Sequence, residues 1–523
     1  MSSVTSKKIS YMTAVQFKES FYEPAPEVGY VYVGNHLPYA NEANPSTTID
    51  SVNDEKLVWE NMIAAKRITG NDVELVIPKI TWTANTKYKQ YDDRVAQEDL
   101  LTGNTSLNVK PMYVYTSQRN VYKCLSNNAS ANSTVEPTGD YTSSNGNIAT
   151  SDGYIWKYMY NVKSSNKFLS ADWIPAPAST AQLDYTVSSI GVLDGELTSI
   201  VVENNGSGYY ENNVAVIPIF ATGCSVLRLA NTTNVVANMF VSGTGIAPGT
   251  FITRVDIPNS NITLSTSTTA AGGGNTTANQ IALTTRIYID GDGTGAVASP
   301  TINTTGYLTK VTVTTIGTAY SRANAFVYGT GSGASLRVVR DMKNGHAFNP
   351  ARELGSNSVM VVSRIGEIDS TENGKIPANT TFRQYGVMIN PYKYGQNTVV
   401  STTNANSVIS QATVLTLVAG ATYSIDEFAY QGLPNDTTAA NTVAHGSILD
   451  QTSSQVRLTN VRGTFQTGVP LRGASSGVSD RLVVTIQNPE FQPYSGDILY
   501  TENAVKTSRT EGQAENIKLI VRF

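Results

Sequence analysis

A regular two-residue alternation over residues 154–162 restricts this part of the chain to an extended strand. Its aromatic residues occupy every second position, namely Tyr154, Trp156, Tyr158 and Tyr160. Successive side chains of a β-strand point to opposite faces of the sheet, so these four rings share one face. The preceding Asp152-Gly153 dipeptide favours a chain reversal. We therefore expect a turn followed by a strand whose aromatic face is buried.

Two more segments have strand patterns and are expected to belong with this strand. Residues 121–125 precede it, and residues 517–523 end the sequence. In the second segment Leu519, Val521 and Phe523 occupy alternate positions, but the residue between Leu519 and Val521 is also apolar. Such a run is typical of a strand that is buried on both faces. We interpret the three segments as parts of one β framework.

The N-terminal part of the chain contains the best helical patterns. Residues 13–22 are expected to form a short helix that ends before Pro24. Residues 54–68 are expected to form a longer helix, with acidic residues at its start and basic residues at its end. Residues 73–82 are typical of a strand that is interrupted by Pro78.

An internal repeat follows in a glycine-rich region. Its two copies, residues 195–209 and 306–320, align without a gap, and the similarity continues at residues 213–216 and 324–327. Each copy predicts a strand, a tight glycine turn and a tyrosine. Two such copies commonly pack together, because neither can bury its apolar face alone.

These patterns predict a mainly β protein with a few short helices: an α+β, β-sandwich-like framework that carries two inserted all-β modules. The framework is expected to consist of residues 1–186, 341–395 and 484–523. Residues 187–340 are expected to form an inserted β-repeat domain with a nested insertion at about residues 223–283. Residues 396–483 are expected to form a second inserted domain, a small barrel or sandwich. Insertions are tolerated where their two ends lie close together.

Composition restricts the classes of function. Charged residues are only 15% of the chain and the formal net charge is −4, without a dense basic cluster, which argues against a nucleic-acid partner. We expect no membrane contact, because no apolar stretch has the length of a membrane span and no signal-peptide pattern opens the sequence. Cys124 and Cys224 are expected to be unpaired, with Cys124 buried in a strand.

Residue types that carry catalysis or bind metals are sparse. The three histidines, His36, His346 and His445, have no partner at metal-ligand spacing. His36 is interpreted as a loop residue. No nucleophile elbow, phosphate-binding loop or dinucleotide fingerprint is present. We therefore expect no catalytic activity, no metal and no cofactor.

Asp290 and Asp292 come nearest to a ligand site, because alternating carboxylates are found in calcium-binding loops. The glutamate that closes such a loop is replaced by Thr301. A similar glycine-rich run at residues 329–334 has no acidic residues. We therefore interpret the motif as a turn between strands, and calcium is expected to leave stability unchanged.

Two patterns are relevant to sugar chemistry, and each also has a purely structural interpretation. The paired carboxylates of a glycosidase are recognised by their positions in space. Asp426 and Glu427 are neighbours, and adjacent strand residues face opposite sides of a sheet, so they are not expected to act as a pair. The aromatic stripe of residues 154–160 offers a stacking surface for sugar rings, but a buried sheet face is the favoured interpretation.

Several separated motifs, in order along the chain, resemble one family of bacteriophage proteins. They are residues 122–125 (Tyr-Lys-Cys-Leu), 135–139 (Val-Glu-Pro-Thr-Gly), 152–158 (Asp-Gly-Tyr-Ile-Trp-Lys-Tyr), 382–391 (Phe-Arg-Gln-Tyr-Gly-Val-Met-Ile-Asn-Pro) and the ending from Ser495 to Phe523. The family is the baseplate wedge subunit of contractile-tailed phages, the gene product eight type of T-even-like phages. The resemblance covers about the first 185 residues, a middle piece and the tail, and it does not cover the two inserts.

The resemblance implies a structural subunit of the virion tail baseplate, assembled in the host cytoplasm. It also implies a homodimer that packs against other wedge proteins, the gene products six, seven and ten of the family. Such a subunit would hold wedge parts together and take part in the rearrangement of the baseplate when the tail contracts. The alternative is an adhesin whose inserted β domains bind glycans on the host surface. A polysaccharide-degrading tail enzyme is a third, weaker interpretation.

Overall fold

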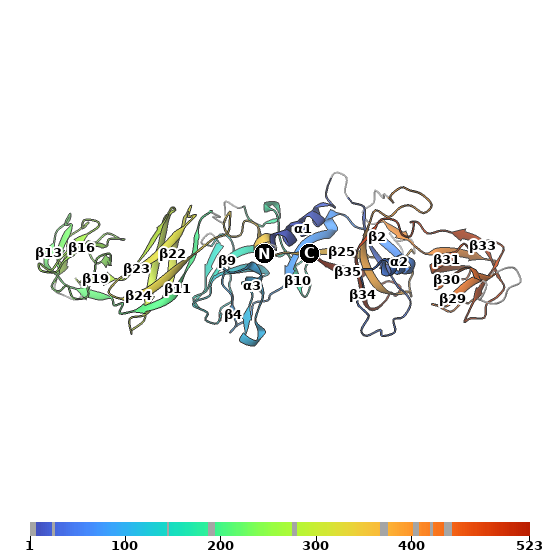
Figure 1. Cartoon of the computed structure of the whole chain (residues 1–523), viewed down its shortest axis with the longest axis horizontal. Coiled ribbons are helices and arrows are strands. Elements are labelled where there is room, and N and C mark those ends of the chain that lie inside the picture. Colours follow the sequence, from blue (N-terminus) through green and yellow to red (C-terminus); the bar gives the residue numbers. More distant parts are fainter. Residues whose placement is uncertain are drawn as a thin grey trace, which may run out of the picture. The chain divides into compact units, whose positions relative to one another are not determined.

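The computed structural model describes residues 7–23, 27–143, 146–186, 194–274, 280–366, 375–400, 407–418, 422–432 and 442–523. Strands make up 46% of the structure and helices 9% (Figure 1). The predicted mainly β fold with a few short helices is therefore confirmed. The chain forms two compact units, one from residues 1–77 and 356–523 and the other from residues 78–355.

The first unit contains a five-stranded antiparallel sheet whose strands come from distant parts of the sequence. In spatial order they are β27 (Val408–Ser410), β2 (Met62–Arg67), β1 (Gly29–Gly34), β26 (Thr381–Ile389) and β34 (Asp497–Ser508). Tyr30 and Tyr32 of β1 are fully buried and share an apolar core with Trp59 of α2 (Val52–Asn61) and Met388 of β26. This core holds α2 against the sheet.

The helix predicted over residues 54–68 is only half correct. The helix α2 ends at Asn61, and the chain continues directly as strand β2. Ser51 caps α2, since its side chain accepts a hydrogen bond from the backbone N–H of Asp54 (3.1 Å). The first four residues of β2 are fully buried because this strand lies between two others, and a strand buried on both faces has no polar alternation.

A second sheet of this unit contains β3 (Val73–Pro78), β25 (Ser358–Ile365) and β35 (Glu515–Arg522), adjacent in this order. Leu519 and Val521 of β35 are buried and Phe523 is half-buried, whereas Lys518 and Arg522 are exposed. The prediction of a strand buried on both faces is therefore wrong, because β35 is the last strand of its sheet and alternates. The helix α1 (Lys7–Glu19), which starts earlier than predicted, contacts Phe523 through Phe17, with ring centroids 5.3 Å apart.

The third part of the first unit is a closed six-stranded barrel. In order around the barrel the strands are β28 (Thr413–Leu417), β31 (Gln455–Gly463), β30 (Thr442–Gln451), β29 (Phe428–Gly432), β32 (Pro470–Gly473) and β33 (Arg481–Gln487). It has an apolar core of its own, with Leu415, Ile448 and Leu458 fully buried. The predicted insert of residues 396–483 started too early, because β27 belongs to the five-stranded sheet.

The second unit contains the aromatic strand β9 (Ile155–Asn161). Its sheet has the order β6 (Tyr113–Tyr115), β7 (Asn120–Ser126), β9 and β8 (Asn147–Ala149). Other short elements of this unit are β4 (Lys87–Tyr88), α3 (Gln97–Leu101), β5 (Val109–Lys110), β10 (Trp173–Pro175) and α4 (Pro350–Glu353). The predicted single framework is thus divided, since β9 and β35 lie in different sheets and different units.

The sequence repeat forms a two-layered sandwich with approximate two-fold symmetry. One layer has the order β21 (Thr294–Ile302), β22 (Leu308–Thr318), β11 (Leu197–Ser207) and β24 (Ser332–Arg340), and the other pairs β20 (Arg286–Gly291) with β23 (Ala323–Tyr328) (Figure 1). The two repeat strands, β11 and β22, are antiparallel neighbours. Ile200 faces Val311, its equivalent in the other copy. The predicted start of this domain, Val187, lies outside the described residues.

The two copies exchange the same contacts. The backbone N–H of Tyr209 donates to the carbonyl of Gly306, and the N–H of Tyr320 donates to the carbonyl of Gly195, both at 3.0 Å. Glycine-rich loops surround the rings of both tyrosines. A Cβ on Gly331 would lie 2.6 Å from the ring of Tyr209, and a Cβ on Gly293 would lie 2.4 Å from the ring of Tyr320. Each copy therefore completes the turn of the other.

A nested β module interrupts the sandwich between Tyr209 and β20. Its strands are β12 (Asn212–Val214), β13 (Val216–Phe220), β14 (Val226–Arg228), β15 (Phe240–Ser242), β16 (Ile252–Asp256), β17 (Asn261–Leu264), β18 (Gly272–Gly274) and β19 (Ile281–Thr284). Val214 and Val216 belong to the apolar core of this module. The insertion thus starts earlier than the predicted residue 223. The repeat similarity at residues 213–216 is not structural, because β20 pairs with β23 instead.

The two-fold arrangement provides a matched pair of glycines that tests how closely the two repeat copies approach each other. Replacing Gly317 by alanine would place a Cβ 2.7 Å from the backbone of Thr294 and Ala296, at a φ of +65°. Replacing Gly295 puts a Cβ at a similar φ of +82° but with nothing nearer than 3.9 Å. We expect Gly295→Ala to cost about 1–2 kcal/mol from backbone conformation alone. Gly317→Ala should cost at least about 1 kcal/mol more, from the added steric overlap.

Urea unfolding of the two variants measures the difference. The symmetry-related pair, Gly206→Ala and Gly333→Ala, should repeat it, because the backbone of residues 332–334 surrounds Gly206 in the same way. Equal destabilisation by Gly317→Ala and Gly295→Ala would show that the close approach of the two strands is not rigid.

Candidate functional site

The aromatic face of β9 is a core and not a surface. Exposed fractions range from 0% to 2% for the predicted core residues Tyr154, Trp156, Tyr158 and Tyr160. The rings of Tyr154 and Trp156 stack at a centroid distance of 5.3 Å, and Tyr122 of β7 meets Tyr158 edge-on at 5.7 Å. No ring of this stripe is therefore available to stack against a sugar.

The opposite face of the same sheet carries buried charge. Lys123 of β7 and Glu353 of α4 form an ion pair in which both side chains are 0% exposed. Lys157 of β9 is 1% exposed and Glu196, next to β11, is 4% exposed. Burial lowers the pKa of Lys123, and the Glu353 carboxylate opposes this change. Together with Asp341 and His346, these four residues form the group that we call the buried charge cluster.

His346 and Asp341 have strongly displaced pKa values. Burial, together with the cations of Lys123 and Lys157, lowers the pKa of His346 well below its ordinary value. Its Nε2 lies 2.7 Å from the hydroxyl of Thr198 on β11. Burial raises the pKa of the Asp341 carboxyl to about 7, and Glu196 and Asp194 act in the same direction.

Displaced pKa values often mark active sites, but they also occur in structural ion pairs. Lys123, His346 and Glu353 are at most 1% exposed, so no substrate reaches them. The cluster instead joins β7 and β9 to β11 and to the segment that leads into α4. This is where the chain enters and leaves the repeat sandwich, so the cluster acts as a structural joint.

A second buried group has the order of a catalytic triad. Nδ1 of His36 lies 2.6 Å from a carboxylate oxygen of Asp426, and its Nε2 lies 2.6 Å from the hydroxyl of Thr459. Hydrolases use this order of hydroxyl, imidazole and carboxylate. Here Thr459 and His36 are each only 2% exposed, which keeps the hydroxyl away from any substrate. The group therefore holds the barrel, through Thr459 and Asp426, against the loop that follows β1.

No local pattern indicates this contact, because His36 and Asp426 are 390 positions apart. Asp426 and Glu427 have different partners, although they lie at a turn before β29 and not in a strand. The carboxylate of Glu427 accepts hydrogen bonds from the backbone N–H groups of Ser424, Ser475 and Ser476.

Asp290 lies in β20, and Asp292 follows this strand next to a glycine–tyrosine turn of the sandwich. The carboxylate of Asp292 accepts hydrogen bonds from the backbone N–H groups of Ser321 (2.9 Å) and Arg322 (3.0 Å), just after Tyr320. Asp290 faces Asn324 across the β20–β23 pair. In the other copy the hydroxyl of Thr330 accepts from the N–H of Tyr210. Within the described residues no group of three His, Cys, Asp or Glu side chains has metal-binding geometry.

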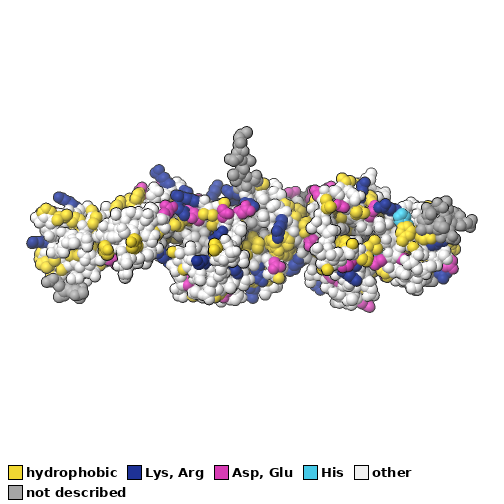
Figure 2. Space-filling view, turned by 60° about the horizontal axis from the view of Figure 1, so that its bottom comes forward, with side chains coloured by type: hydrophobic (Ala, Val, Ile, Leu, Met, Phe, Trp, Pro, Cys, Tyr) yellow, Lys and Arg dark blue, Asp and Glu magenta, His cyan; other side chains and the backbone are white. Residues whose placement is uncertain are grey.

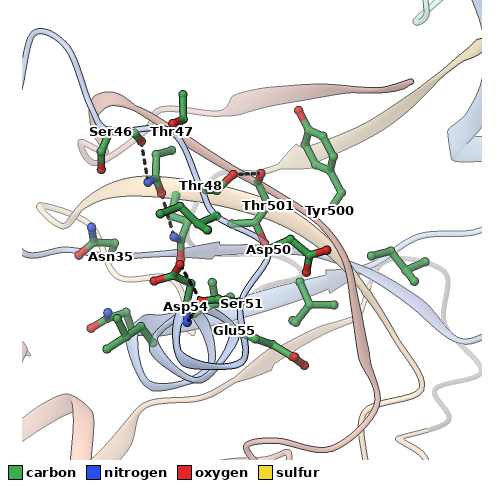
Figure 3. Close-up of a pocket in the computed structure, with 18 of the residues that line it drawn as sticks. Asn35, Ser46, Thr47, Thr48, Asp50, Ser51, Asp54, Glu55, Tyr500 and Thr501 are labelled. Carbon is green, nitrogen blue, oxygen red and sulfur yellow. Dashed lines mark hydrogen bonds between the residues drawn. The ribbon is translucent and has the colours of Figure 1, made fainter. Parts of the chain in front are cut away.

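A polar groove of about 580 Å³ lies in the first unit, beside β34 (Figure 3). One wall is the extended segment of residues 46–51, together with the first turn of α2, and the other is residues 498–503 of β34. The hydroxyl of Thr48 donates to the carbonyl of Thr501 (3.2 Å), and the side-chain amide of Asn503 donates to the carbonyl of Ser46 (3.0 Å).

The charged lining of this groove is entirely acidic. Asp50, Asp54 and Glu55 line it, whereas no lysine or arginine does. None of these residues was singled out as a site from the sequence. The capping pattern of Ser51 and Asp54 marks a helix start, but the groove forms only because β34 comes from the other end of the chain.

No protein-family model matches the chain, and no characterised protein shows significant similarity to it. Functional interpretation therefore depends on the residues and their geometry. Both cysteines are free thiols, with Cys124 buried in β7. Among the helices that the structure describes, none is long and apolar enough to cross a membrane.

The raised pKa of Asp341 predicts a pH dependence. Its ordinary value is about 3.9, so the carboxyl binds its proton more tightly in the folded chain. The folded state should therefore lose stability as the pH rises from about 4 to about 7. The loss is at most about 4 kcal/mol for this displacement. Asp341→Asn should flatten the dependence, because it keeps an uncharged side chain of the same shape.

Urea unfolding at several pH values within this window tests the effect. The matched control is Glu211→Gln, which changes an exposed carboxyl of the same unit and should leave the slope of the parent chain unchanged. A slope in Asp341→Asn equal to that of the parent would show that Asp341 does not titrate in this range.

Proposed function

We propose that the chain is a non-catalytic structural protein, a subunit of the tail baseplate wedge of a contractile phage. The observation that carries the proposal is the position of the segments that resemble this family. Residues 152–158 lead into β9, residues 382–391 contain most of β26, and residues 495–523 contain β34 and β35. These strands belong to sheets of both units. The barrel and the repeat sandwich have separate apolar cores.

The chemistry of the described residues suits such a role. The groups with an enzyme-like arrangement are the buried charge cluster and the group around His36. Their central residues, Lys123, Glu353, His36 and Thr459, are at most 2% exposed. Most of the face drawn in Figure 2 consists of uncharged polar side chains and backbone. A surface of this kind suits wet, hydrogen-bonded contacts between proteins. In the proposal the chain forms a homodimer and contacts neighbours that correspond to the gene products six, seven and ten of the family.

Electron microscopy of labelled virions tests this proposal. An epitope tag in the exposed turn of residues 511–513 should place gold-labelled antibody at the baseplate body of the phage that encodes the chain. Label only at fibre tips would contradict the proposal. Sedimentation of the purified chain tests the homodimer separately, and a monomer at high micromolar concentration would contradict that part.

The alternative of a glycan-binding adhesin is favoured by one surface of the repeat sandwich. Tyr288 of β20 faces Phe326 of β23, and their exposed fractions are 37% and 45%. The two rings are nearly parallel, with centroids 6.4 Å apart, and Tyr328 lies 6.0 Å from Tyr288. The guanidinium of Arg286 lies over the ring of Tyr288 at 5.2 Å. Exposed aromatic faces next to polar groups can stack against sugar rings.

A glycan array probed with the purified full chain decides whether this surface binds sugars. If it does, the double variant Tyr288→Ala with Phe326→Ala should lose the bound glycans. The control Tyr307→Ala removes a single aromatic ring that is 44% exposed and should retain them. An array with no bound glycan, or one unchanged by the double variant, would contradict the adhesin.

A further inference from the structure

The free edge of β34 is an unusual feature of the first unit. This strand has 12 residues and is the last in its sheet, so only β26 pairs with it. A long, unpaired strand edge is a template for pairing with another chain, and proteins generally cover such edges. Residues 46–50 run along this edge, but they form no ladder with β34 in the structure.

Side chains bridge the gap where a partner strand would donate backbone groups. The carbonyl of Thr501 accepts its bond from the hydroxyl of Thr48 and not from a backbone N–H. Asn503 makes the second bridge through its side-chain amide. Nearby, the Oε1 atom of Gln384 is buried and has no hydrogen-bond partner among the described residues. The edge thus offers acceptors that an extended backbone can satisfy.

The groove beside this edge has the size and the side chains of a binding site. Its volume of about 580 Å³ lies within the range of about 300–1,000 Å³ that is usual for ligand pockets. Apolar side chains project at its walls and are largely exposed: Ile49 (69%), Leu57 (41%) and Leu499 (43%). They offer contacts for alternate side chains of an extended peptide, which is how strand addition gains specificity.

The charge of the groove lining determines which kind of peptide is complementary to it. The carboxylates of Asp50, Asp54 and Glu55 line the groove without a basic residue among its lining (Figure 3). A segment with several lysines or arginines is therefore complementary, whereas an acidic segment is repelled.

We propose that this groove binds an extended, basic segment of a partner protein, which adds as a strand to the free edge of β34. The backbone N–H groups of the segment take the place of the Thr48 hydroxyl at Thr501, and residues 46–48 move aside while Ile49 and Asp50 remain in the wall of the groove. The two side-chain bridges are thereby exchanged for a series of backbone bonds in register. This inference goes beyond the proposed function and does not depend on it.

The test uses the full chain and three fluorescent peptides of about ten residues. The first alternates lysine with threonine, the second alternates glutamate with threonine, and the third is the lysine peptide N-methylated at alternate residues. Fluorescence anisotropy should show saturable binding of the first peptide only. N-methylation removes the N–H donors but keeps the charge, so it should weaken binding by at least about tenfold.

Three variants locate the site. Asp50→Lys combined with Glu55→Lys should weaken binding of the lysine peptide by at least about tenfold, since both carboxylates are exposed and reverse their charge. Thr48→Ala should strengthen binding several-fold, because it removes the competing hydroxyl. The matched control Glu511→Lys reverses an exposed charge in the loop between β34 and β35 and should change the affinity less than about twofold.

Each other result overturns the inference. Equal affinity for the methylated peptide would show that charge, and not backbone hydrogen bonding, accounts for the binding. Equal affinity of the double variant would place the site elsewhere, as would weaker binding by Thr48→Ala. Absence of binding to all three peptides at millimolar concentration would exclude the site. A virion label at the baseplate is unaffected by any of these results, so the two proposals fail independently.

Discussion

Antiparallel pairing between strands that are distant in the sequence is the constraint on which both units depend. β26 pairs with β34 in the first unit, and β11 pairs with β24 in the second. The chain consequently leaves and re-enters each sheet at neighbouring strands. The intervening segments can then form modules with cores of their own, because their ends are already close together. This is the physical basis for a chain that carries a barrel, a sandwich and a nested module.

One of these connections contains a buried charge pair. The Lys123–Glu353 pair is completely buried, and the loss of one partner would leave an uncompensated charge in a medium of low polarity. His36 makes a comparable buried contact at the barrel. Both groups resemble catalytic machinery in composition, and in both the solvent exposure decides against catalysis. Residue type and proximity are therefore insufficient to assign an active site in this chain.

The sequence predicted the local elements better than their partners. The alternation around Trp156 predicts a buried strand because a two-residue period is a local property of the backbone. The predicted helix is wrong over residues 62–67, because a strand buried on both faces has no such period. The contact of His36 with Asp426 and the groove beside β34 depend on pairing between opposite ends of the chain. The repeat predicted the sandwich, but the place where the nested module enters had no local signal.

The reciprocal contacts of Tyr209 and Tyr320 have a consequence for the order of events during synthesis. Gly195 and Tyr209 leave the ribosome long before Gly306 and Tyr320, which must supply their partners. Pairing of β12 with β19 closes the nested module. The module can therefore form its core before the second copy has been synthesised. Contacts of such long sequence separation form slowly. We expect the first copy to spend this interval with an unprotected strand, at risk of pairing with a neighbouring nascent chain.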